Sequence, residues 1–198
     1  MSLRSLSKLV ASLSFFACTS LFAAPVTVTL VNVDSYGVFG DPGNTVYNLF
    51  VGAGATITGL SYDVNLTAFF PSYLSEISLA ITDSAILNGV SFAPADAVGD
   101  DFSGTGTYSG SADLTTMYDA DGVPLTFSVG ADGILRLEFF EAFDDASVAP
   151  DGIWNFGTVT FDVTQAAVTP AVPEPASLLL VAAGLAAMGY FGSRRRRA

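Results

Sequence analysis

The chain has 198 residues, of which 19 are acidic and seven basic, and it contains no histidine and a single cysteine. Residues 25–172 hold 18 of the acidic residues and only one basic residue, Arg136, which gives this central segment a net charge of −17. Binding to nucleic acid needs clustered lysine and arginine against the phosphates, so the composition excludes that class of function.

Residues 1–24 have the organisation of a secretory signal peptide. A basic start is followed by an apolar run over residues 9–22 and then by small residues, which is the pattern that signal peptidases process. We expect cleavage after Ala23 or after Ala24. The cysteine, Cys18, lies inside this segment, so we expect no disulfide in the exported domain.

Apolar and polar residues alternate with period two through the central segment. Leu60, Tyr62 and Val64, for example, are separated by polar residues, and such alternation predicts strands that are buried on one face. Between Leu30 and Val31 the apolar phase slips by one residue, which predicts a β-bulge. Strands are expected over residues 26–33, 45–51, 57–67, 74–82, 90–92, 104–109, 125–129, 135–139 and 158–163.

Turn-forming pairs such as Asn88-Gly89 separate these runs, and no stretch between them has the period of an amphipathic helix. About nine antiparallel strands with wet outer faces predict an all-β fold, a two-sheet sandwich of jelly-roll-like topology. We assign it residues 25–165, followed by a linker at residues 166–172. The strand order is also loosely similar to the P-domain sandwich attached to proprotein convertases, a resemblance that favours the sandwich and implies no catalytic residue.

The central segment lacks histidine, cysteine and lysine. This absence excludes Ser-His-Asp, Cys-His and Ser-Lys nucleophiles and also zinc sites built on histidine or thiolate. Its glutamates are Glu76, Glu138 and Glu141, and a glycoside hydrolase needs only two carboxyl groups at a suitable separation. A carboxylate-based hydrolase is therefore a remote alternative. We expect no enzymatic activity and no catalytic residue.

Aspartates gather in three expected loops, and carboxylate oxygens are the ligands that calcium prefers. The preferred candidate is the loop with Asp144, Asp145 and Asp151, whose acids flank the end of a strand. The alternative is that these side chains are solvated and cap turns. Calcium is the only cofactor that we consider. The weaker candidate groups are Asp96, Asp100 and Asp101, and Asp119 with Asp121.

Three aromatic residues, Phe69, Phe70 and Tyr73, lie close together in an expected loop. Exposed rings of this kind are typical of carbohydrate-binding modules, in which sugars stack on them. The alternative is that the aromatic residues of this chain fill the core between the two sheets. The two interpretations predict opposite exposures for these rings.

The C-terminal segment, residues 173–198, combines three unlike parts. A helix over its apolar run would be about 26 Å long, near the lower limit for crossing a bilayer. We expect a transmembrane helix with the arginines on the cytoplasmic side, and on these grounds alone an ordinary single-pass anchor is the alternative. The parts are the triplet Pro173, Glu174 and Pro175, the uncharged run over residues 176–192, and the cluster Arg194, Arg195, Arg196 and Arg197.

These three parts, in this order, resemble the PEP-CTERM sorting signal of Gram-negative bacteria. The resemblance implies an exosortase-type enzyme that recognises the Pro173–Pro175 triplet, cuts near it and releases the domain to the cell surface or the extracellular matrix. It also implies an association with exopolysaccharide or biofilm. The expected function is therefore that of an exported, non-enzymatic surface or matrix protein. The alternative is a carbohydrate-binding module that depends on calcium or on exposed aromatic rings.

Overall fold

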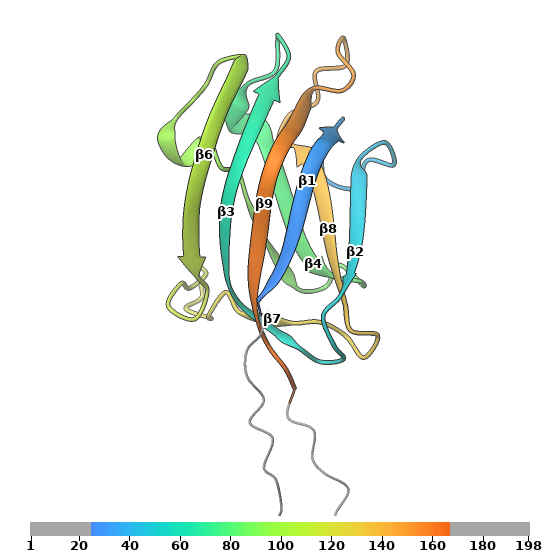
Figure 1. Cartoon of the computed structure of the whole chain (residues 1–198), viewed down its shortest axis with the longest axis vertical. Helices are drawn as coiled ribbons and strands as arrows, with labels where there is room; N and C mark the ends of the chain where they lie inside the picture. The colour runs from blue at the N-terminus through green and yellow to red at the C-terminus, as the bar shows by residue number, and fades with distance from the viewer. Residues whose placement is uncertain (1–24, 167–198) are drawn as a thin grey trace, which may run out of the picture. The chain divides into compact units, whose positions relative to one another are not determined.

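A computed structural model describes residues 25–166 (Figure 1). These residues form nine strands and two short 3₁₀-helices, and none of their helices has the length and apolar character needed to cross a bilayer. The expected signal peptide and sorting tail, with the helix expected in each, lie outside the described residues. The elements are β1 (Val26–Ser35), β2 (Thr45–Phe50), β3 (Thr56–Ala68), η1 (Leu74–Glu76), β4 (Ile77–Asp83), β5 (Gly89–Phe92), η2 (Asp96–Val98), β6 (Gly104–Asp113), β7 (Phe127–Ser128), β8 (Ile134–Glu141) and β9 (Gly152–Thr164).

The strands form two sheets. Sheet A has the order β1-β9-β3-β6, with the short β7 paired to β3, and sheet B has the order β2-β8-β4-β5. Every pairing is antiparallel. Sheet A lies in front of sheet B in Figure 1. The expected all-β fold, a sandwich of two antiparallel sheets, is confirmed for the described residues.

The core between the sheets is built around three large aromatic side chains. Trp154, Phe139 and Phe161 are fully buried, and the rings of Trp154 and Phe139 meet edge to face with their centroids 5.4 Å apart. Leucine, isoleucine and valine side chains from both sheets complete one continuous cluster around them. Burial of each such side chain stabilises the fold by about 1.5–3 kcal/mol, and this packing holds together a domain that has no disulfide.

The period-two pattern places side chains correctly on β8 but not on β4. On β8, Leu135, Leu137 and Phe139 face the core and are fully buried. On β4 all seven residues are buried, including Ser78 and Thr82 on the outer face of sheet B. The expectation of a wet outer face is wrong for this strand, because the β1–β2 and β4–β5 loops line the surface above it.

Two local expectations also need correction. Residues 74–76 form η1 rather than the start of a strand, because the Glu76 carboxylate accepts a hydrogen bond (2.8 Å) from the backbone N–H of Tyr73. The phase slip in β1 is present, since Val31 and Asn32 are both exposed. The expected β-bulge is not formed there, because the register of β1 with β9 is the same on both sides of the slip. The slip occurs instead at Asn32, whose backbone is left-handed (φ 48°), a conformation that asparagine tolerates. The register shifts occur instead between β3 and β9.

The two ends of the sandwich hold different segments of the chain. Val26 at the start of β1 pairs with Phe161 near the end of β9, so the described chain enters and leaves at one end, the tail end. Ala68 at the end of β3 pairs with the start of β9, which puts the loops 69–73 and 142–151 at the opposite end, the far end. Figure 1 shows these loops beyond the tips of β3 and β9.

Candidate functional site

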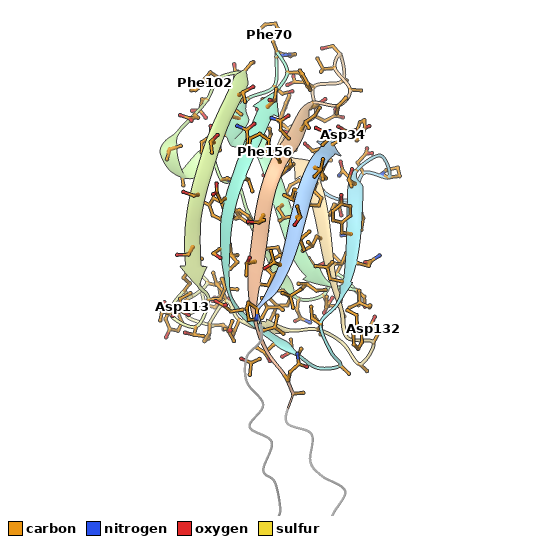
Figure 2. The ribbon with its side chains drawn as sticks, in the orientation of Figure 1. Asp34, Phe70, Phe102, Asp113, Asp132 and Phe156 are labelled. Carbon is orange, nitrogen blue, oxygen red and sulfur yellow. The ribbon has the colours of Figure 1, made fainter. Side chains whose placement is uncertain are left out.

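Aromatic side chains are exposed at the far end of the sandwich. Phe70 is 82% exposed, and Phe69 and Tyr73 in the same loop are also exposed. Phe102 and Phe143, from two neighbouring loops, are exposed as well. Figure 2 shows Phe70 and Phe102 at this end, away from Asp113 and Asp132 at the tail end. These exposures agree with the surface interpretation of the aromatic loop and not with a place in the core.

Three loops at the far end are joined around Ser72, which is buried. The Ser72 hydroxyl donates a hydrogen bond to Asp145 (2.9 Å), and the Ser103 hydroxyl donates to the Ser72 carbonyl oxygen (2.8 Å). The backbone N–H of Phe69 donates to the carbonyl oxygen of Asp151 (2.9 Å). The aromatic loop, the loop before β6 and the loop before β9 are therefore fixed to one another.

The three aspartates proposed for calcium have unlike surroundings. Asp144 is exposed, Asp145 is half-buried and bonded to Ser72, and Asp151 is fully buried. One oxygen of Asp151 accepts a hydrogen bond from the backbone N–H of Asp145 (2.8 Å), and the other has no partner in the described part of the chain. Burial raises the pKa of Asp151, and the charges of Asp144 and Asp145 raise it further. Among residues 25–166 no three acidic side chains are arranged to hold a metal ion, so calcium binding stays a prediction from the sequence.

Glu141, one of the three glutamates considered for a hydrolase, is a buried carboxyl group, and its burial was not expected from the sequence. It continues the inward row of β8 and is fully buried, with one oxygen accepting a hydrogen bond from the Ser35 hydroxyl. Its other oxygen has no partner among the described residues. Burial raises the pKa of Glu141 to about 8, and the nearby charges of Asp151, Glu76 and Asp145 raise it as well. The hydrogen bond from Ser35 opposes this shift. The period-two pattern of β8 already contained this position, because Glu141 has the same phase as Phe139.

Glu138 lies on the opposite face of the same strand and is held differently. Its carboxylate meets the Arg136 guanidinium at 2.6 Å and accepts hydrogen bonds from the backbone N–H of Gly40 (2.6 Å) and the Asn44 amide (2.9 Å). Burial alone would raise the pKa of Glu138, but these partners together lower it. Because Glu138 and Glu141 point to opposite faces of sheet B, they do not form the carboxylate pair of a glycoside hydrolase.

The weaker acidic groups behave as turn caps and loop anchors. The Asp119 carboxylate accepts hydrogen bonds from the backbone N–H groups of Asp121 (2.9 Å) and Val123 (2.8 Å). Asp100 accepts a hydrogen bond from the Tyr108 hydroxyl (2.7 Å). Aspartate commonly closes turns as Asp119 does, so the capping alternative accounts for Asp119, whereas Asp100 is bonded to a side chain of β6.

The described residues form an all-β sandwich, and the C-terminal segment that follows them matches a known sorting motif. The family model of the PEP-CTERM protein-sorting motif matches residues 171–197, a range that contains the triplet Pro173, Glu174 and Pro175 and the four arginines. The chain therefore carries a PEP-CTERM motif, which implies export, recognition by an exosortase-type enzyme and sorting to the bacterial cell surface. The residues of the motif lie outside the described residues.

The other comparisons add no functional assignment. No curated protein matches the chain. A chain in a solved structure titled "nora virus structure" is similar at 15% sequence identity, over 87% of this chain and 71% of that chain, with a TM-score of 0.25. At that score the likeness carries no argument about fold or activity.

Proposed function

We propose that this protein is a non-enzymatic component of the surface or extracellular matrix of a Gram-negative bacterium. The sandwich carries out its function, and the C-terminal tail directs its sorting. The sorting motif at residues 171–197 is the observation that carries this proposal. In this proposal, a helix over residues 176–192 holds the protein in the membrane until the exosortase-type enzyme cuts near Pro173–Pro175. The sandwich then leaves for the surface or the matrix.

Two features support the absence of catalysis. The central segment has no histidine, cysteine or lysine to activate a nucleophile. Glu138 is occupied by Arg136 and by two N–H donors, and it faces away from Glu141. Hydrolysis of any member of a broad glycan panel by the native protein would contradict this part of the proposal.

Sorting is tested by changing the triplet in the producing cells. Replacing Pro173, Glu174 and Pro175 together by alanine removes the recognised sequence and leaves the apolar run and the arginines in place. We expect the variant to accumulate in the membrane fraction, whereas the wild-type protein reaches the surface or the medium. Pro170→Ala, just outside the matched range, is the control and should sort normally. Normal sorting of the triple variant would overturn the proposal.

The jelly-roll-like topology belongs to the same proposal. Strands pair from the ends of the chain inward: β1 with β9, β2 with β8, β3 with β6, and β4 with β5. In each sheet two such pairs lie side by side, with β7 as an addition at β3. This nesting is what results when one long antiparallel ribbon is wound into two sheets, and it supports a jelly roll.

A second candidate function is association with extracellular polysaccharide, and the exposed aromatic loop at the far end favours it. Phe70 and Tyr73 are exposed on one loop, and the hydrogen bonds of Ser72 fix the backbone of that loop between the two rings. Phe70→Ala with Tyr73→Ala should reduce retention of the protein on polysaccharide from the producing cells. Unchanged retention would remove the aromatic loop from this function.

A further inference from the structure

The edges of sheet A are longer than those of sheet B. Sheet A ends in β1 on one side and β6 on the other, each ten residues long and, among the described residues, each paired on one side only (Figure 1). Sheet B ends in β2 and β5, which have six and four residues. An unpaired edge presents free N–H and C=O groups to another strand, and proteins limit such pairing by keeping edge strands short. Sheet A therefore offers two long strands to a partner.

Neither edge of sheet A carries the usual protection against pairing. Proteins commonly place charged residues, above all lysine, or proline on an exposed edge. β1 and β6 contain no lysine, arginine or proline, and each has a single acidic residue, Asp34 or Asp113, close to its last position. The left-handed Asn32 interrupts the alternation of β1, so the stretch suited to regular pairing is residues 26–31. This stretch is uncharged although the central segment has a net charge of −17.

The half of β6 nearest the tail end is open to solvent. Ser109 and Ser111 are exposed on the outer face of sheet A, and Gly110 between them is also exposed, although it has the same phase as the buried Tyr108. Three consecutive exposed residues show that sheet B does not cover this part of the edge. On β1, the outward residues Thr27 and Thr29 are exposed in the same way.

Strand direction makes β6 and β1 complementary. All pairings in sheet A are antiparallel, so β1 and β6, at the two ends of a row of four strands, run in opposite directions. A second copy in the same orientation can therefore place its β1 antiparallel to the β6 of the first. Two β6 strands could pair antiparallel only if one copy were inverted. Because every copy leaves the sandwich at the tail end, the β6–β1 arrangement keeps all tails on one side, as copies held in one membrane require.

The register of sheet A also continues into a second copy. One row of hydroxyl side chains crosses the outer face from edge to edge, and its successive partners are Thr27, Thr160, Ser61 and Ser111. The next row toward the far end begins at Thr29 and ends at Ser109. A second copy at the same height would set its Thr27 beside Ser111 and its Thr29 beside Ser109. Such cross-strand hydroxyl pairs stabilise a sheet.

We infer that copies of this chain extend sheet A by pairing β6 of one copy antiparallel with β1 of the next, with Ser111 beside Thr27, and so form a linear assembly. The inference rests on the matrix part of the proposed function, for which it supplies a mode of assembly. The contact joins two different edges, so every added copy leaves one β1 and one β6 free for further growth. The negative charge of each copy opposes association, and salt should promote it by screening this repulsion.

Cysteine cross-linking of the native exported protein tests the register. The only native cysteine, Cys18, lies in the expected signal peptide. Within one copy, Thr27 and Ser111 are three strand spacings apart, about 14 Å, which is too far for a disulfide. Any disulfide in the double variant Thr27→Cys with Ser111→Cys therefore joins two copies, and we expect a ladder of linked species. A mixture of the two single variants should give a mixed dimer and nothing longer.

Thr164→Cys mixed with Ser111→Cys is the matched control, because Thr164 is exposed but lies at the end of the interior strand β9. This mixture should cross-link only at the background rate of random collision. Cross-linking of the Thr27→Cys and Ser111→Cys mixture at that same rate would overturn the inference. Disulfide dimers of Ser111→Cys alone would also overturn it, because they would show contact between two β6 strands.

Sedimentation velocity of the native protein measures the assembly itself. We expect species larger than a monomer, in proportions that rise with protein and salt concentration. Thr27→Lys with Ser111→Lys sets like charges opposite each other and should weaken association about two- to fivefold, whereas Thr27→Glu with Ser111→Lys should restore it. Both positions are exposed, so the melting temperature should not change.

A wild-type protein that is monomeric at every salt concentration would overturn the inference. Sorting has its own test in the triplet variant, so a monomer that reaches the surface or the medium would refute the assembly and leave the sorting function standing.

Discussion

Two buried glutamates of β8, Glu138 and Glu141, lie on opposite faces of sheet B, and their pKa values are shifted in opposite directions. On the outer face Glu138 has a guanidinium and two N–H donors, and its pKa is lowered. On the inner face Glu141 has one hydroxyl donor and carboxyl neighbours, and its pKa is raised to about 8. Burial raises the pKa of both groups: at Glu138 the guanidinium and the N–H donors together outweigh it, whereas at Glu141 burial is the largest cause of the shift.

Breaking the outer ion pair should have the largest effect on stability. Arg136→Met leaves Glu138 buried without its counter-charge, and such a loss typically costs about 3–5 kcal/mol in the free energy of unfolding. The double variant Arg136→Met with Glu138→Leu removes both charges and should recover most of that loss. Urea unfolding measures both. An equal loss in the single and the double variant would contradict the pairing.

The pH dependence of stability should follow Glu141. Between its ordinary value of 4.5 and about 8, the folded state keeps a proton that the unfolded state has released. The stabilisation is therefore complete below about pH 4.5 and is lost as the pH rises through 8. At about 1.4 kcal/mol per pKa unit, and with relaxation around the ionised group, we expect a loss on the order of 3 kcal/mol.

Glu141→Gln mimics the protonated acid and should remove this fall. Urea unfolding of the wild type and the variant at several pH values between 4.5 and 9 measures the difference. Glu138→Gln is the comparison on the opposite face, and it should leave the fall in place. A wild-type stability that does not decline over this range would show that Glu141 ionises without penalty.

The calcium hypothesis predicts the smallest effect. A site at Asp144, Asp145 and Asp151 with the affinity of extracellular modules would stabilise the fold by about 1 kcal/mol at millimolar calcium. EDTA should then lower the unfolding midpoint of the wild-type protein but not that of Asp151→Asn. Asp132→Asn, at the tail end, should keep the dependence on calcium. A midpoint that does not respond to EDTA would reject the hypothesis.

The sequence predicted the strands well because alternation is a local property. The runs around Leu60 and Leu137 lie in β3 and β8, and Glu141 could have been recognised as an inward residue by its phase on β8. The burial of the outer face of β4 could not be predicted, because it depends on the positions of the β1–β2 and β4–β5 loops in the folded chain. Phe39 and Thr82, 43 positions apart in the numbering, line one hollow on the outer face of sheet B only in the folded chain.

The far end illustrates the same limit on prediction. The exposure of Phe70 agrees with its expected loop, but the hydrogen bonds that join Ser72 to Asp145 and Ser103 connect residues that are distant in sequence. Asp144, Asp145 and Asp151 are close in the sequence and still have different surroundings. Spacing along the chain therefore identified the candidate residues but not the environment of each.

The most direct test of the central claim is the intact mass of the native protein recovered from its producing cells. The account predicts a chain that begins after Ala23 or Ala24 and ends near Pro173–Pro175, because the signal peptide and the membrane tail have both been removed. A mass that still includes Arg194–Arg197 would contradict it. The protein would then be a permanently anchored single-pass protein and not one released by sorting.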